Sequence, residues 1–148
     1  MAVNSSTKDR GKAAEKAVEK VLKKWNEYSA FAYWRLPDAR SARGYLAAQL
    51  GDFGWFCTGR GGILEVKSTQ HAYRIAKDKI SQLATLKKMD LAGAENLILI
   101  QHTEENVWRA VRPGNLDSDV PSWDLRSYPT YDTPEAALRS TGWFEGLL

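Results

Sequence analysis

The chain has 148 residues, of which 43% are hydrophobic and 26% charged, so it is long enough to bury a core and too apolar to be intrinsically disordered. Its net charge of +3 and its pI near 9.0 modestly favour a polyanionic partner. The single cysteine, Cys57, excludes an intrachain disulfide, and His71 and His102 add too few ligands for a Cys/His zinc site.

The expected location is the cytoplasm. Scarce cysteine is typical of a reducing compartment. No apolar run approaches the roughly 18 residues of a membrane span, and the polar N-terminus lacks a secretory pattern.

The N-terminal part predicts a flexible basic segment at residues 1–10, followed by a helix at residues 11–28. The helix is amphipathic, because its apolar residues form one stripe: Ala14, Val18, Val21, Leu22 and Trp25. Glu15 lies at the border of that stripe, whereas Glu19 lies further toward solvent. The Glu15 side chain is therefore able to reach the edge of a sheet.

Residues 31–36 read as a strand ended by Pro37, and residues 40–51 are ambiguous between a loop and a short helix. Two more strands are expected at 53–56 and 63–68, joined through the turn-rich segment 57–62. If the turn centres near Thr58-Gly59, the strands form a hairpin in which Asp52 faces Glu65.

A second helix is expected at about residues 75–91, with Ile80, Leu83, Leu86 and Met89 facing inward. Strands at 97–101 and 107–111 follow, joined by a turn at 103–106. The predicted order is αβββαββ, which indicates an α/β fold with a mixed central sheet flanked by helices.

Periodicity is weak after Pro113. A short helix is expected to start at Thr133-Pro134, as N-cap and first residue, and to stop at Gly142. The apolar residues beyond it must dock either on their own domain or on a second subunit: Trp143, Phe144, Leu147 and Leu148.

The predicted hairpin carries the residues with the clearest chemistry. Period-two alternation places Glu65 and Lys67 on one face of a strand, and Asp52 faces Glu65 from the other strand. Two close carboxylates repel, so a bound hard cation such as Mg²⁺ explains the arrangement. Lys67 is then placed to orient or deprotonate water, or to offset charge on a phosphate. The alternative is an exposed Glu-x-Lys pair on a solvated strand face.

Basic residues flank this hairpin in the sequence and are candidate contacts to a DNA backbone: Lys8, Arg10, Lys12, Arg40, Arg43, Arg60 and Arg74. No major-groove reading motif accompanies them, which favours recognition of shape over base sequence. Trp25 and Trp55 are expected in the core, with base stacking as the alternative for Trp55. His71 is interpreted as polar surface.

Four elements in order resemble the PD-(D/E)xK nuclease superfamily, and within it the Holliday junction resolvases of the archaeal Hjc type and their bacterial RecU relatives. These elements are Gly11-x-x-x-Glu15, Asp52, Glu65-Val66-Lys67-Ser68-Thr69 and Gln82, so the resemblance covers roughly residues 10–102. It implies a restriction-endonuclease-like fold. The expected division of the chain is a nuclease domain at residues 11–112 and a C-terminal extension at residues 113–148, packed on the same domain or on a dimer partner.

The resemblance also implies roles for individual residues. Glu15, Asp52 and Glu65 would surround the metal with the Val66 carbonyl, Lys67 would be catalytic, and Gln82 would support the site. The implied cofactor is Mg²⁺, with Mn²⁺ as a substitute. The implied assembly is a homodimer that makes paired symmetric nicks in four-way DNA junctions.

Several alternatives stay open at this point. Asp38 follows Pro37 in a literal Pro-Asp, but hairpin adjacency to Glu65 favours Asp52. Another PD-(D/E)xK endonuclease of restriction or repair type, or an inactive DNA-binding module, would fit the same motifs. The small size would suit a phage gene, which would place the protein in the host cytoplasm.

Overall fold

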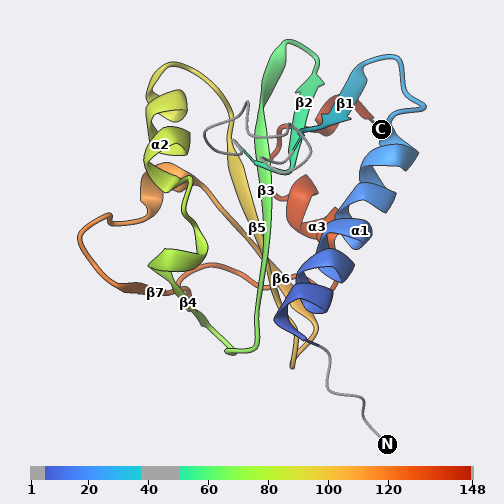
Figure 1. Cartoon of the computed structure of the whole chain (residues 1–148). Helices are drawn as coiled ribbons and strands as arrows, with labels where there is room; N and C mark the ends of the chain where they lie inside the picture. Colours follow the sequence, from blue (N-terminus) through green and yellow to red (C-terminus); the bar gives the residue numbers. More distant parts are fainter. Residues whose placement is uncertain (1–5, 38–50, 148) are drawn as a thin grey trace, which may run out of the picture.

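A five-stranded mixed sheet forms the centre of the molecule (Figure 1). The structure is a computed structural model that describes residues 6–37 and 51–147. The strands lie in the order β1-β2-β3-β5-β6, and only β3 and β5 run parallel. Their bounds are β1 Phe31–Arg35, β2 Phe53–Cys57, β3 Arg60–Thr69, β5 Leu97–His102 and β6 Val107–Val111.

Different elements cover the two faces of this sheet. Helices α1 (Thr7–Trp25) and α3 (Pro134–Arg139) pack on one face (Figure 1). Helix α2 (Leu83–Leu91) and a small sheet of β4 (Arg74–Ala76) and β7 (Ser122–Asp124) lie on the other. The predicted α/β class and the αβββαββ order of the main elements are confirmed. In the described part of the chain, no helix is long and apolar enough to cross a membrane.

Helix α1 begins earlier than expected. The Ser6 hydroxyl accepts a hydrogen bond from the Asp9 N–H at 3.1 Å, so Ser6 is the N-cap and the helix starts at Thr7. Residues 7–10, expected in a flexible segment, are therefore helical. The apolar stripe is confirmed, since four of its members are buried: Ala14, Val18, Leu22 and Trp25.

Strands β2 and β3 form the predicted hairpin. Cys57 pairs with Arg60, so Thr58 and Gly59 are the two turn residues, with φ of 45° and 84°. Such positive φ values at both positions are typical of the type I′ turn that suits the twist of a two-residue hairpin. The register pairs Phe53 with Leu64, which brings Asp52 opposite Glu65 as expected.

The predicted helix at 75–91 is wrong over its first half. Residues 74–76 form β4, residues 77–79 form a 3₁₀ helix, and α2 starts at Leu83. Ile75 is buried opposite Trp123 of β7, a partner far along the chain. This pairing overrides the local helical pattern, because strand formation here depends on tertiary contacts.

The C-terminal segment packs on its own chain. Thr133 caps α3 by accepting a hydrogen bond from the Ala136 N–H at 3.1 Å, as predicted. Trp143 stacks on Trp55 with ring centroids 5.8 Å apart, and Phe144 lies 4.9 Å from Trp25. Two further 3₁₀ turns, Pro113–Asn115 and Glu145–Leu147, complete the structure.

Candidate active site

Asp52 lies at the start of β2 and is held by its backbone and its side chain. Its N–H donates to the Leu64 carbonyl at 3.1 Å, and its own carbonyl accepts from the Leu36 N–H at 3.0 Å. The Asp52 carboxylate oxygen Oδ2 accepts from the Val66 N–H at 2.7 Å. Asp52 is 8% exposed, so its carboxyl is buried and fixed against the backbone of β3.

Glu65 and Lys67 lie side by side on β3. Glu65 is 2% exposed, and its Oε1 lies 3.2 Å from the Lys67 Nζ. The other oxygen, Oε2, is buried and receives no hydrogen bond within residues 6–37 and 51–147 when all three carboxyl groups are ionised, whereas a protonated Asp52 would donate to Glu65. A charged oxygen in that position is costly unless a ligand satisfies it. The buried setting argues against the alternative of a solvated Glu-x-Lys pair.

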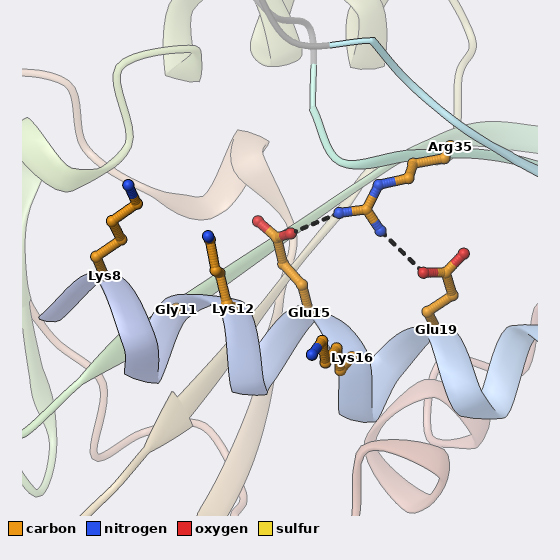
Figure 2. Close-up of a pocket in the computed structure, with 7 residues that line it drawn as sticks. All are labelled: Lys8, Gly11, Lys12, Glu15, Lys16, Glu19 and Arg35. Carbon is orange, nitrogen blue, oxygen red and sulfur yellow. Dashed lines mark hydrogen bonds and ion pairs between the residues drawn. The ribbon is translucent and has the colours of Figure 1, made fainter. Parts of the chain in front are cut away.

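Glu15 reaches the same site from α1 and is joined there to Arg35 of β1. The two Arg35 Nη atoms lie 2.9 Å from Glu15 Oε2 and 2.9 Å from Glu19 Oε1, so the guanidinium bridges the two glutamates (Figure 2). Tyr33 adds a hydrogen bond to Glu19 at 3.2 Å. These contacts fix Glu15 near the Asp52 carboxyl, which acts on its ionisation.

The electrostatics of the three carboxyl groups depend mainly on burial. Burial raises the pKa of Asp52 to about 7, repulsion from Glu65 adds to this, and the Val66 N–H opposes it. Burial also raises the pKa of Glu15 to about 7, with repulsion from Asp52 adding to it and Arg35 opposing it. The pKa of Glu65 is raised by burial and held back by Lys67. A cation would be needed to keep all three ionised at neutral pH.

The donors fit a hard cation that takes part of its ligands from solvent and substrate. Across the described ranges, no three or more His, Cys, Asp and Glu side chains form a complete metal site. Mg²⁺, however, commonly binds one or two carboxylates and keeps water and phosphate oxygens as its other ligands. Asp52 and Glu65 supply two carboxylates, and the Val66 carbonyl points to the same side of β3 as the N–H that bonds Asp52.

A basic cavity of about 630 Å³ opens beside Glu15 along α1. Lys8 and Lys12 project on the same side of the helix as Glu15, and Lys16 and Arg35 also line the cavity (Figure 2). Lysine and arginine side chains around a carboxyl site are suited to a polyanion such as a DNA backbone. Two of the predicted DNA contacts, Lys8 and Lys12, therefore lie next to the candidate site.

The other predicted basic contacts are dispersed. Arg10 donates to the Thr7 hydroxyl at 3.1 Å, and Arg60 is exposed at the start of β3. Arg74 lies in β4, where it donates to Ser122 at 3.0 Å. Arg40 and Arg43 lie outside the described residues, as does the alternative ligand Asp38. Their roles in DNA binding stay predictions.

Gln82 is not joined to the carboxyl groups by any hydrogen bond found among the described residues. It is the N-cap position of α2, and its Oε1 accepts from the Ser81 hydroxyl at 3.2 Å. Its supporting role stays a prediction. Trp55 is confirmed as a core residue with 1% exposure, so base stacking at that position is excluded.

Arg35 is the site residue that the sequence interpretation missed. A signal was available, because Glu15 and Glu19 are four residues apart and therefore share one helix face. Two carboxylates at that spacing repel each other, so a nearby cation is expected on physical grounds. The strand that supplies the cation is not identifiable from the helix alone.

Comparison with known proteins supports the fold. No protein-family model matches the chain, and no curated protein matches it. Among solved structures, the chain is similar to Archaeoglobus fulgidus Hjc, a Holliday junction resolvase from an archaeal hyperthermophile, solved at 1.6 Å. The two share 20% identity with a TM-score of 0.52, over 86% of this chain and 95% of that one. The predicted restriction-endonuclease-like fold is thereby confirmed, together with the structural resemblance to Hjc.

Proposed function

We propose that this protein is a metal-dependent endonuclease that cuts four-way DNA junctions. The observation that carries the proposal is the row of carboxyl groups that ends at Lys67, in which Glu15 is half-buried and Asp52 and Glu65 are buried. Perturbed carboxyl groups beside a lysine and a basic cavity are suited to phosphodiester hydrolysis. The similarity to a Holliday junction resolvase supports a branched substrate. We further infer a homodimer that makes paired nicks.

Each residue has a defined task in this proposal. Asp52, Glu65 and the Val66 carbonyl would hold Mg²⁺, with Mn²⁺ as a substitute. Bound Mg²⁺ supplies charge that polarises the phosphate and makes water a stronger nucleophile at neutral pH. Lys67, fixed at 3.2 Å from Glu65, orients the attacking water or offsets the charge that develops on the phosphate oxygens.

Glu15 and Arg35 position these groups. Arg35 holds the Glu15 carboxyl against the site and lowers the pKa of that carboxyl, which burial raises. Lys8 and Lys12 are placed to neutralise the phosphates that flank the cut. We infer a cytoplasmic enzyme, in a host cell if the gene is of phage origin.

The test uses a labelled immobile four-way junction and a linear duplex of matching sequence, incubated with the protein in Mg²⁺ or EDTA. We expect symmetric nicks on the junction alone and only with metal, resolved on native and denaturing gels. Cutting of the duplex instead would indicate a restriction or repair endonuclease. Binding without cutting under any divalent ion would indicate an inactive module.

Single-residue variants test the role proposed for each residue. Asp52→Asn and Lys67→Ala are expected to lower cleavage by about 10²-fold or more while junction binding persists, because each removes a group used at the reacting phosphate. Asp119→Asn and Lys24→Ala are matched controls, since Asp119 is exposed and Lys24 forms a surface ion pair. Full activity in Asp52→Asn would remove Asp52 from the set of metal ligands.

A further inference from the structure

Two exposed aromatic side chains lie on the face of strands β1 and β2 that turns away from α1. Trp34 of β1 is 43% exposed and Phe56 of β2 is 57% exposed. Their ring centroids are 5.6 Å apart with an interplanar angle of 33°. In contrast, the neighbouring Phe53 and Trp55 point to the opposite face and are buried in the core. The strands thus divide their aromatic residues between a core face and an open face.

Two glycines create the room for these rings. Trp34 lies opposite Gly54, and a Cβ on Gly54 would collide with the Trp34 indole. Phe56 lies opposite Gly61, and a Cβ on Gly61 would collide with the Phe56 ring. Both rings therefore rest on bare backbone, which leaves an aromatic surface directed to solvent.

This surface lies on the same face of the sheet as Asp52. Asp52, Gly54 and Phe56 alternate along one strand and share a face. At about 3.4 Å per residue, the positions of Trp34 and Phe56 are offset from Asp52 by roughly 7 and 14 Å along the strand direction. Stacked nucleotides rise by about 3.4 Å each, so the rings lie about two to four nucleotides from a phosphate at Asp52.

The positions beside the two rings present no charge that would repel a nucleic acid. By register, the neighbours on the open face are Ala32, Gly54 and Gly61. No carboxylate of the described residues between Asp52 and the hairpin turn would repel an approaching phosphate backbone. An uncharged aromatic surface binds nucleic-acid bases by stacking, which is possible with every base.

The area of the pair argues against a second copy of the chain as its occupant. A stable interface buries about 800 Å² on each partner. Large aromatic side chains bury about 150–250 Å² each, so two half-exposed rings offer only about 200 Å². Elsewhere in the described ranges the exposed large apolar side chains are Tyr28 and Leu91. The patch matches a nucleobase better than a protein surface.

We propose that Trp34 and Phe56 form a stacking platform for an unpaired or unstacked base at the branch point of the junction. This inference rests on the proposed function and names how the site would distinguish branched from linear DNA. Base faces in a continuous duplex are covered by their neighbours, whereas bases at a branch are unstacked at lower cost. Selection of branches then follows from stacking, without any reading of sequence.

The test measures binding of the full chain in EDTA to a four-way junction with 2-aminopurine at a branch nucleotide, and to the matching duplex. Trp34→Leu and Phe56→Leu are each expected to weaken junction binding about 10- to 100-fold, with duplex affinity unchanged. Phe56→Tyr keeps a flat ring and should bind like the wild type. Tyr28→Leu removes another exposed aromatic and serves as the matched control. The wild type, but not the leucine variants, should quench 2-aminopurine fluorescence.

Three outcomes would overturn the stacking platform. Leucine variants that bind the junction with wild-type affinity would exclude stacking while the proposed function stands, provided that the wild type cuts junctions. Leucine variants that change from dimer to monomer in light scattering would assign the face to a second copy. A wild type that neither binds nor cuts junctions would exclude the proposed function and the platform together.

Discussion

The carboxyl groups of Asp52 and Glu15 ionise with a pKa of about 7, which makes the unfolding free energy depend on pH. Both pKa values are raised above those of the unfolded chain, so the protein takes up protons on folding between about pH 4 and pH 7. The stabilising contribution is complete below the unfolded pKa and is lost as the pH rises through the folded pKa. Without a metal ion, the folded state therefore carries a penalty that grows from about pH 4 to about pH 7 and persists at pH 8.

We expect the metal-free protein to lose unfolding free energy, on the order of a few kcal/mol, between pH 5 and pH 8. Asp52→Asn should flatten this dependence and make the metal-free protein more stable than the wild type at pH 8. Mg²⁺ should stabilise the wild type more than the variant. Urea titrations at both pH values measure these differences. If the unfolding free energy of the two proteins changed equally between pH 5 and pH 8, the assignment of the buried charge to Asp52 would be contradicted.

Arg35 influences the ionisation of Glu15 in the same row of carboxyl groups. The Arg35 charge lowers the pKa of Glu15, so Arg35→Gln should let that pKa rise further. If ionised Glu15 assists cleavage, the acidic limb of the pH–rate profile shifts upward, by up to about one pH unit. Arg126→Gln is the matched control, since Arg126 pairs with Asp124 on the surface. An unchanged profile would show that Glu15 takes no part.

Residues of the hairpin were predictable because a two-residue turn fixes its own register. Once Thr58 and Gly59 are the turn, Asp52 must lie opposite Glu65. The Arg35 contact was not predictable in the same way, because it joins a helix to a strand whose relative placement depends on packing. The burial of Glu65 was likewise not predictable. Strand alternation assigns a residue to one face of the sheet, but it does not show which element covers that face.

At the level of elements, β3 is anchored by one buried asparagine. Asn96 is fully buried, and its Oδ1 accepts from the Ile63 N–H at 2.8 Å while its Nδ2 donates to the Leu86 carbonyl at 3.0 Å. It thereby joins the strand that carries Glu65 to helix α2. Gly62, next to Ile63, has no room for a side chain, because a Cβ there would collide with the Glu95 carbonyl.

Asn96→Leu is expected to destabilise the protein by about 2–4 kcal/mol, because it leaves a buried N–H and a buried carbonyl unpaired. Asn96→Asp keeps an acceptor for Ile63 and should cost less than Asn96→Leu if the buried carboxyl is protonated. The exposed Asn115 supplies the control variant Asn115→Ala. Urea unfolding measures the difference. A loss below about 0.5 kcal/mol in Asn96→Leu would mean that water or rearrangement satisfies both groups.

The predicted helix at 75–91 shows where local pattern fails. Ile80, Leu83 and Leu86 are buried as expected, but the first residues of that stretch are held in β4 by β7. The β7 strand lies in the part of the sequence where periodicity is weak, so neither strand predicts the other. In contrast, β6 and the Thr133 cap of α3 matched their predictions, because short-range signals determine both.

For the molecule as a whole, the packing of the C-terminal segment is a long-range property. Its apolar residues indicated that it must be covered, but not by which surface. The structure buries Trp143, Phe144 and Leu147 in the cluster that contains Trp25 and Trp55. The segment therefore closes the core beneath the hairpin that carries Asp52 and Glu65. Stability of this core and positioning of Asp52 are linked through β2.

Trp143→Ala tests that link, since it removes the ring that stacks on Trp55. Loss of a buried aromatic should lower the unfolding free energy by about 3–5 kcal/mol. Because the segment packs on its own chain, this loss should be the same at two protein concentrations a hundredfold apart, measured by urea unfolding. Trp34→Ala, on the open face, should cost far less and is the control. A loss that grows on dilution would instead assign the contact to a partner subunit.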